Sequence, residues 1–328
     1  MKKILITGGA GFIGSHLAKR LVKQGHEVTV VDNFERGKIE YLKDCEGFPN
    51  LRIVHSDLRE ISENDSESLF EDVDTVIHMA SKVGGINTYL SKPYEVMAAN
   101  IKIDSNVLNA VIKNGIPRYY YASSAHVYPK NLQGDKDSPK ISENEVIPAD
   151  PELSYGWGKL IGEKMVEYAC QENSTLRAAV GRFIGIYGEN QDFDLETGSV
   201  IPVFSHRAVK HPEIPFIVKG TGEETRSYCF IEDALDCIEL MLDKLDNQQI
   251  IGPLNVGKEE RISIKNIAEK IIDISGKNVY IDFDRSCKTV IWGQWCDLSK
   301  TKKVLDWEAK TTMEQGLKKV YEDIKKRL

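Results

Sequence analysis

A tyrosine and a lysine four positions apart, Tyr155 and Lys159, are the residues whose types and spacing best suit chemistry. In a helix, residues at this spacing lie on one face. A phenol with an ordinary pKa of about 10 is a poor base at neutral pH, and a neighbouring ammonium group lowers that pKa. The pair therefore predicts a phenol with a lowered pKa, suited to act as a base. The competing interpretation is a solvated helix face without chemistry.

Three glycines near the start of the chain, Gly8, Gly11 and Gly14, directly follow the apolar run Lys3–Thr7. Glycines at this place let the backbone turn tightly and approach a pyrophosphate, whose charge lies at the amino end of the next helix. Asp32 ends the next apolar run, where a carboxylate can bind a ribose 2′-hydroxyl and would repel a 2′-phosphate. This pattern favours NAD over NADP. The alternative is a tight turn with an unrelated surface aspartate.

Short β-branched runs alternate with amphipathic helices through the first half of the chain, which predicts an α/β fold with a doubly wound parallel Rossmann sheet. The expected strands are Ile4–Thr7, Val28–Asp32, Leu51–His55, Thr75–His78, Tyr119–Ser123 and Leu176–Phe183, and the expected helices include His16–Gln24, Pro93–Lys113 and Tyr155–Gln171. We expect residues 1–187 and 227–251 to form the NAD-binding domain. Residues 188–226 and 252–328 would form a smaller α/β substrate lobe over the carboxyl ends of the strands, where such sheets bind ligands.

Composition excludes several classes of function. The chain has 328 residues, 41% of them hydrophobic and 28% charged, and a net charge of −7, so it lacks the basic footprint of a nucleic-acid-binding protein. Its first apolar run is too short to span a bilayer and is interrupted by glycines, unlike a signal peptide. The six cysteines form no C-x-x-C pair. We therefore expect a cytoplasmic protein with reduced thiols, no metal site and no membrane or nucleic-acid partner.

The G-x-x-G-x-x-G spacing, with Ser123-Ser124 and Tyr155-x-x-x-Lys159 in that order, resembles the extended short-chain dehydrogenases/reductases over nearly the whole chain. This family comprises NAD-dependent nucleotide-sugar epimerases and dehydratases. The resemblance implies that Ser124 steadies a sugar hydroxyl, Tyr155 removes its proton, and Lys159 binds the nicotinamide ribose. A hydride would pass to NAD and return within one cycle through a transient ketone. Zero net redox change suits an isomerase.

The same resemblance assigns further residues to the cofactor. Asp57 and Leu58 would border the adenine, and Asn100 would be the active-site asparagine. The complete set expected to bind NAD is Gly8, Gly11, Phe12, Ile13, Gly14, Asp32, Asn33, Asp57, Leu58, Met79, Ala80, Ser81, Asn100, Tyr155, Lys159 and Phe183. By the same analogy, Pro93–Lys113 and Tyr155–Gln171 would form a homodimer interface.

The segment Ser123–Pro129 bears on the type of reaction, because the resembling enzymes differ at the position of His126. Dehydratases have a glutamate there, simple 4-epimerases a threonine, and GDP-mannose 3,5-epimerases and GDP-fucose synthases a cysteine. A histidine matches none of them, but it can exchange a proton near neutral pH. His126 would then move protons at a carbon next to the ketone or contact the substrate. The alternative is a hydrogen-bonded spacer at the mouth of the site.

Two segments resemble the GDP-sugar enzymes. The loop from Lys82 to Ile86 is similar to K-V-G-G-I of GDP-fucose synthases, and Arg226 lies in a run similar to the T-R-S-F of 3,5-epimerases, whose arginine binds the substrate diphosphate. The expected catalytic residues are Ser124, Tyr155, Lys159 and His126. The expected substrate-binding residues are Lys82, Gly84, Gly85, Ser123, Ser124, His126 and Arg226.

Other positions depart from these enzymes. Asp194 stands where the 3,5-epimerases have a second acid/base lysine, and Ser199 where GDP-fucose synthases have a second catalytic histidine. The expected function is therefore an NAD-dependent nucleotide-sugar epimerase, with a GDP-sugar 3,5-epimerase-like reaction favoured. The alternatives are a 4-epimerase, a nucleotide-sugar 4-dehydrogenase or reductase, and a cofactor-bound binding protein without turnover.

Overall fold

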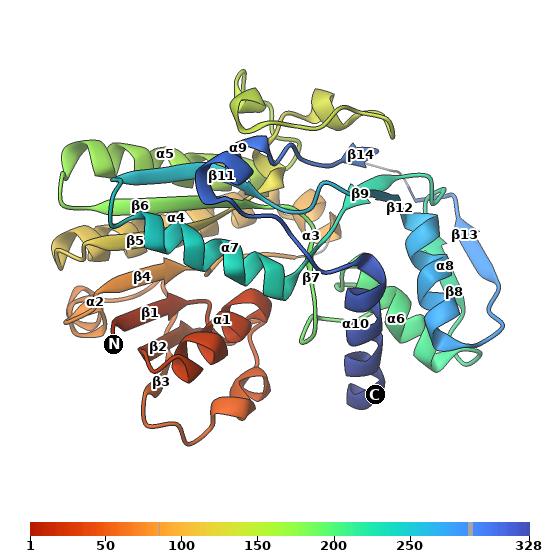
Figure 1. Ribbon diagram of the computed structural model, residues 1–328, viewed down its shortest axis with the longest axis horizontal. Helices are drawn as coiled ribbons and strands as arrows, with labels where there is room; N and C mark the ends of the chain where they lie inside the picture. The colour runs from red at the N-terminus through yellow and green to blue at the C-terminus, as the bar shows by residue number, and fades with distance from the viewer. Residues whose placement is uncertain (85, 288–290) are drawn as a thin grey trace.

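The computed structural model describes residues 1–84, 86–287 and 291–328. Its centre is a seven-stranded sheet in the order β11-β6-β5-β4-β1-β2-β3, in which every neighbouring pair is parallel (Figure 1). The doubly wound parallel sheet expected from the sequence is confirmed. Its strands are β1 (Lys3–Thr7), β2 (Glu27–Asp32), β3 (Leu51–His55), β4 (Thr75–His78), β5 (Arg118–Ser124), β6 (Arg177–Phe183) and β11 (Ile250–Val256).

Helices cover both faces of this sheet, so its strands are apolar on both sides. In β1, Ile4 and Ile6 pack in one core cluster with residues of α1 (Phe12–Lys23) and α7 (Ile231–Lys244). Leu5 points the opposite way, into a second cluster with α4 (Pro93–Lys113) and α5 (Ser154–Glu172). The alternation follows from the two-residue period of a strand.

Shorter elements complete this part of the chain. They are the helices α2 (Glu63–Phe70) and α3 (Ile86–Ser91), and the 3₁₀ turns η1 (Ile39–Cys45), η2 (Ala125–Val127), η3 (Lys130–Gln133) and η4 (Glu143–Val146). β1 lies between β2 and β4, so the chain runs outward from β1 in both directions across the sheet. A crevice at the carboxyl ends of the strands is expected at such a point.

A smaller group of elements lies beside the sheet (right in Figure 1). It contains the strand pair β8-β13, the three-stranded sheet β12-β9-β14 and three helices. Their bounds are β8 (Phe216–Lys219), β9 (Thr225–Ser227), β12 (Arg261–Ser263), β13 (Ile281–Asp284), β14 (Gly293–Gln294), α6 (Val200–Lys210), α8 (Ile264–Ser275) and α10 (Met313–Arg327). The connecting elements are β7 (Ile186–Tyr187), β10 (Cys229–Phe230) and α9 (Ser299–Leu305).

Two boundaries differ from those expected. Helix α1 begins at Phe12, not at His16, because the glycine turn closes within Gly8–Gly11. Strand β11 crosses the expected limit between residues 251 and 252, and Leu254, Asn255 and Val256 still pair with β6 in the main sheet. Its register shifts between Ile251 and Leu254. Pro253 lies in that gap and has no N–H to donate to a neighbouring strand.

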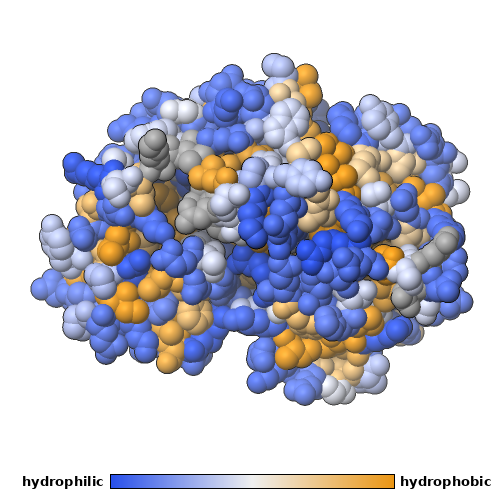
Figure 2. All heavy atoms as spheres, turned by 180° about the vertical axis from the view of Figure 1, so that it is seen from behind, coloured by the Kyte–Doolittle hydropathy of each residue, from blue (hydrophilic) through white to orange (hydrophobic). Residues whose placement is uncertain are grey.

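Hydrophilic side chains cover most of the face shown in Figure 2, and apolar residues form separate clusters between them. Among the helices of the described residues, none is long and apolar enough to cross a membrane.

Candidate active site

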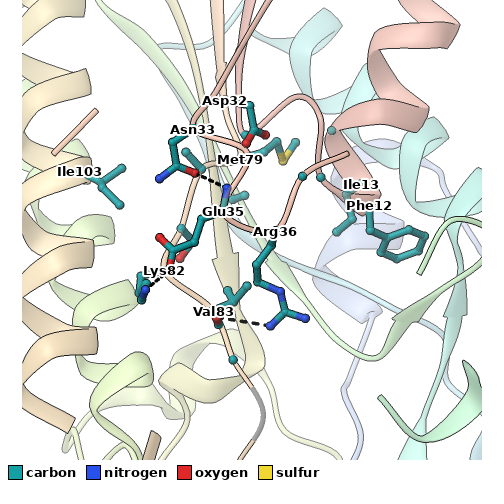
Figure 3. Close-up of a pocket in the computed structure, with 18 of the residues that line it drawn as sticks. Phe12, Ile13, Asp32, Asn33, Glu35, Arg36, Met79, Lys82, Val83 and Ile103 are labelled. Atoms are coloured by element: carbon teal, nitrogen blue, oxygen red, sulfur yellow. Dashed lines mark hydrogen bonds and ion pairs between the residues drawn. The ribbon is translucent and has the colours of Figure 1, made fainter. Parts of the chain in front are cut away.

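A cavity of about 490 Å³ opens at the carboxyl ends of the central strands (Figure 3). It collects residues from β2, β5 and α5, and from the segments that follow β1 and β4, which are far apart in the sequence. Its lining includes most residues expected to bind cofactor or substrate: Gly8, Gly11, Phe12, Ile13, Gly14, Asp32, Asn33, Asp57, Leu58, Met79, Ala80, Ser81, Lys82, Gly84, Ser123, Ser124, Tyr155, Lys159 and Phe183.

The glycine turn at one wall of the cavity leaves no room for side chains. Gly8 has a φ of +66°, and a Cβ there would lie 2.7 Å from the backbone nitrogen of Ala80. A Cβ at Gly14 would lie 2.3 Å from the carbonyl oxygen of Gly8. Helix α1 starts at this turn, and its N-cap, Gly11, has no side chain to cap the first N–H groups. These N–H groups are therefore available to an anionic ligand.

Asp32 lies at the end of β2 with its carboxylate fixed by the backbone. Its Oδ2 accepts a hydrogen bond from Ala10 N at 3.0 Å, and its Oδ1 accepts one from Phe34 N at 2.9 Å. Burial raises the pKa of Asp32, and these backbone hydrogen bonds oppose that shift. Each carboxylate oxygen has further lone pairs. Asp32 is therefore held in one orientation and can still accept hydrogen bonds from a diol.

Tyr155 lies at the other end of the cavity, between two aromatic rings. The ring of Tyr89 is stacked on it at a centroid distance of 5.4 Å, and the ring of His126 meets it edge-on at 5.6 Å. Burial raises the pKa of Tyr155 to about 12, although hydrogen bonds with the Ser81 and Ser124 side chains lower it. The phenol is thus protonated at neutral pH and needs a nearby positive charge to act as a base.

Lys159 is one helical turn after Tyr155 and is almost fully buried, with 1% of its surface exposed. Its Nζ lies 4.8 Å from the centre of the Tyr121 ring. Burial lowers the pKa of Lys159, and the carboxylates of Asp104 and Glu163 raise it. The expected pairing of Tyr155 and Lys159 on one helix face is therefore present at the cavity.

His126 does not line the cavity, but its ring contacts that of Tyr155, and Arg226 interacts electrostatically with His126. Burial, together with the positive charge of Arg226, lowers the pKa of His126 to about 4. His126 is therefore neutral at neutral pH, where it can accept a proton. The Arg226 guanidinium donates to the carbonyl oxygens of Thr225 at 2.8 Å and Ile291 at 2.7 Å. These carbonyl groups orient Arg226 but do not neutralise its charge.

Charged side chains from three loops meet across the cavity. Figure 3 shows Glu35 and Lys82 pointing towards each other, where they form an ion pair, and Arg36 reaching the carbonyl oxygen of Val83. Arg36 also pairs with Asp192 at 3.0 Å. Lys82, expected to bind substrate, is thus engaged by a residue of the loop after β2.

Asn100, too, is not among the residues that line the cavity. Asn100 is fully buried, and its Oδ1 accepts hydrogen bonds from Lys82 N at 2.7 Å and Ser81 Oγ at 2.8 Å. Asn100 therefore stabilises the segment of Ser81 and Lys82, which lines the cavity. Gly85 lies outside the described residues.

Sequence reasoning missed Glu35, Arg36 and Tyr89. Their partners lie in other elements, and no spacing within their own segments signals the contacts. The ring of Tyr89 reaches Tyr155 because α3 turns back towards the cavity, where the Tyr89 hydroxyl accepts a hydrogen bond from Gly84 N at 3.1 Å.

Comparison with known proteins identifies the family. The model of the NAD dependent epimerase/dehydratase family matches residues 4–257. The chain belongs to this family. It is 31% identical to UDP-N-acetyl-alpha-D-glucosaminuronate decarboxylase of Bacillus cytotoxicus, over 97% of this chain and 96% of that protein. It is 29% identical to GDP-mannose 3,5-epimerase of Arabidopsis thaliana, over 99% of this chain and 83% of that protein.

A solved structure supports the same assignment. UDP-glucuronic acid 4-epimerase from Bacillus cereus, in complex with UDP-glucuronic acid and NAD, has a TM-score of 0.85 and 25% identity to this chain. The comparison covers 99% of this chain and all of that one. The chain is therefore similar to enzymes that differ in the sugar and in the reaction but share the NAD-binding fold.

The residues present fit NAD, the cofactor of this epimerase/dehydratase family. The uncapped amino end of α1 and the bare glycine turn can receive a pyrophosphate. Asp32 would hold the adenosine ribose, and Tyr155 and Lys159, which line the same cavity, would contact the nicotinamide end of the dinucleotide.

Asp32→Asn is expected to weaken NAD binding about tenfold, because a hydrogen bond to a charged group contributes about 1.5–3 kcal/mol. It should also narrow the preference for NAD over NADP, since it removes the charge that repels a 2′-phosphate. Calorimetric titration of both dinucleotides measures this. Asp44→Asn, at an exposed carboxylate, is the control. Equal affinity of the unsubstituted protein for NAD and NADP would contradict the role of Asp32.

Proposed function

We propose that this protein is an NAD-dependent epimerase of a nucleotide-activated sugar that works through a transient keto intermediate and exchanges a proton at the neighbouring carbon, as a 3,5-epimerase does. The observation that carries the proposal is the position of His126. A neutral imidazole lies with its centroid 5.6 Å from that of the Tyr155 ring, and Tyr155 lines the cavity together with Ser124 and Lys159.

In the first step, Tyr155 removes the proton of a ring hydroxyl while Ser124 hydrogen bonds with the same oxygen. Lys159 stabilises the phenolate with its positive charge, as Tyr155 needs in a site that raises its pKa to about 12. NAD, held by the glycine turn and Asp32, would supply hydride transfer from and back to the ring carbon. Tyr155 gives the proton back in the last step.

In the middle step, His126 removes a proton from the carbon next to the ketone and returns it to the opposite face after the intermediate changes orientation. The ketone makes that proton acidic, and a neutral imidazole is the form that accepts it. A substrate diphosphate bound to Arg226 would neutralise the charge that lowers the pKa of His126. Substrate binding would therefore make His126 a stronger base.

The second candidate is a 4-epimerase, which needs only Ser124, Tyr155 and Lys159. The similar solved structure of UDP-glucuronic acid 4-epimerase favours it. A net oxidoreductase would use the same three residues but consume dinucleotide stoichiometrically. The uronate decarboxylase relative adds one further outcome, release of carbon dioxide from a uronate sugar.

The test is incubation in deuterated water with GDP-, UDP- and dTDP-sugars, uronates included, followed by mass and proton spectra. We expect isomerisation with deuterium at a carbon-bound position. His126→Asn should lower that exchange about 10²-fold or more, the size of a general acid–base contribution. Isomerisation without deuterium would overturn the role of His126 and indicate a 4-epimerase. Net formation of NADH or of carbon dioxide would overturn the epimerase assignment.

A further inference from the structure

A chain of buried polar groups lies under the end of the cavity that holds Lys159. Asp104 of α4 accepts a hydrogen bond from the Tyr121 hydroxyl at 2.5 Å and contacts Nε2 of His78 at 3.0 Å. The other ring nitrogen of His78 lies 2.6 Å from Oγ1 of Thr7. Asp104 is 2% exposed and His78 fully buried. A carboxylate so far from water needs a compensating charge.

The counter-charge of the Asp104 carboxylate is the ammonium group of Lys159. Lys159 Nζ lies 4.8 Å from the centre of the Tyr121 ring, and the hydroxyl of that ring donates to Asp104. The ammonium group and the carboxylate interact electrostatically, each favouring the charged form of the other. Glu163 also faces Lys159, but it forms two hydrogen bonds with the buried guanidinium of Arg182, at 2.8 and 2.7 Å. Arg182 therefore compensates Glu163, which leaves Asp104 to compensate Lys159.

The other titratable groups that face Asp104 and Lys159 on this side are uncharged. Burial lowers the pKa of His78, so its imidazole is neutral and carries no charge of its own. Burial raises the pKa of Tyr121 and that of Tyr119, so both phenols remain protonated. Asp104 is thus the negative charge that remains between β4, β5 and α4 beneath Lys159.

Gly162 makes room for this arrangement. A Cβ at Gly162 would lie 2.0 Å from the Tyr121 hydroxyl oxygen and 2.6 Å from Oδ2 of Asp104. The helix α5 that carries Tyr155 and Lys159 therefore approaches Asp104 closely only because residue 162 has no side chain.

We propose that Asp104 is the positioning residue that holds Lys159 as a buried ammonium group beneath Tyr155, and thereby fixes the pH range in which Tyr155 can act. Asp104 acts through Lys159 and has no contact with the reacting atoms. Its effect on rate rests on the proposed function. Its effect on folding does not, and folding therefore supplies the independent test.

The folding test uses thermal unfolding of Asp104→Asn across pH. This variant removes the carboxylate that compensates the buried charge of Lys159. The pKa of Lys159 in the folded state therefore falls further below its pKa in the unfolded state. The unfolded state then binds more protons between those two pKa values, and stability is lost as the pH falls through that window. We expect a loss of several degrees in Tm at pH 7 that shrinks towards pH 10.

The double variant Asp104→Asn/Lys159→Met removes the buried charge and should recover most of that loss. Asp233→Asn is the control, because this buried carboxylate accepts hydrogen bonds from the backbone of Lys310 and Thr311 and does not face Lys159. Its loss of Tm should not shrink towards pH 10. If Asp104→Asn does not fold, Lys159→Met gives the complementary test. It leaves Asp104 unpaired, and its Tm should rise as the pH falls and Asp104 takes up a proton.

The rate test follows kcat with pH on the sugar that the protein accepts. In Asp104→Asn, the alkaline limit should move to lower pH, with about a tenfold loss at pH 9 relative to pH 7, because Lys159 loses its proton earlier. At acid pH the loss should be smaller, since Asp104 also disfavours the Tyr155 phenolate. A pH profile of kcat for Asp104→Asn that runs parallel to that of the unsubstituted protein would overturn the proposal. A double variant Asp104→Asn/Lys159→Met that is no more stable than Asp104→Asn would overturn it as well. A stability rescue without turnover would support the pair and contradict only the proposed function.

Discussion

Tyr155→Phe is expected to lower kcat about 10³-fold, within the range of 10²–10⁴ found for the loss of a general acid–base group. Phenylalanine keeps the ring that packs against Tyr89 and His126 and removes only the hydroxyl that exchanges the proton. NAD binding and Tm should change little, because the ring contacts remain. Steady-state kinetics, with calorimetric titration of NAD as the second measurement, give both values.

Tyr168→Phe is the matched control for this substitution. Tyr168 lies on the same helix α5, but its side chain is 57% exposed and away from the cavity, so kcat should stay within a factor of two. A Tyr155→Phe variant that keeps more than a tenth of the activity would show that another group moves the proton. Parallel loss of kcat and NAD affinity would instead indicate a structural role.

The parts of the site that lie within one segment were predictable from the sequence. The turn from Gly8 to Gly14 and the pair Tyr155 and Lys159 depend on local backbone geometry, which spacing determines. Asp32 was predictable because the end of a parallel strand fixes where its side chain points. The sheet followed from the alternation of apolar strands and helices, although β11 was not among the expected strands.

The rest depends on contacts between segments far apart in the sequence. Lys82 resembled a substrate-binding residue, but its position opposite Glu35 depends on how two loops fold against each other. Nothing in the sequence of its own helix distinguishes Asp104 from other polar residues. Its contacts are with His78 of β4 and Tyr121 of β5, which only the folded sheet brings together. The pKa of about 4 for His126 likewise comes from burial and from Arg226, one hundred residues later.

Glu163→Gln is expected to reduce the free energy of unfolding by about 3–5 kcal/mol, because it leaves a buried guanidinium without its counter-charge. The Arg182 and Glu163 side chains are only 2% and 5% exposed, and Ser123 Oγ also donates to Glu163. Urea denaturation measures the loss. The control is Glu167→Gln on the same helix, whose pair with Lys164 is solvent-exposed and should contribute less than about 1 kcal/mol.

A double variant separates the effect of the charges of Glu163 and Arg182 on stability from the effect of their side-chain volumes. Glu163→Leu/Arg182→Met replaces both ions by apolar side chains of similar volume and should recover at least half of the stability lost in Glu163→Gln. Ser123 would lose its acceptor, so recovery should be incomplete. If Glu163→Gln and Glu167→Gln proved equally stable, Arg182 would be compensated by another anion. The compensation of Glu163 by Arg182, from which the assignment of Asp104 to Lys159 follows, would then fail.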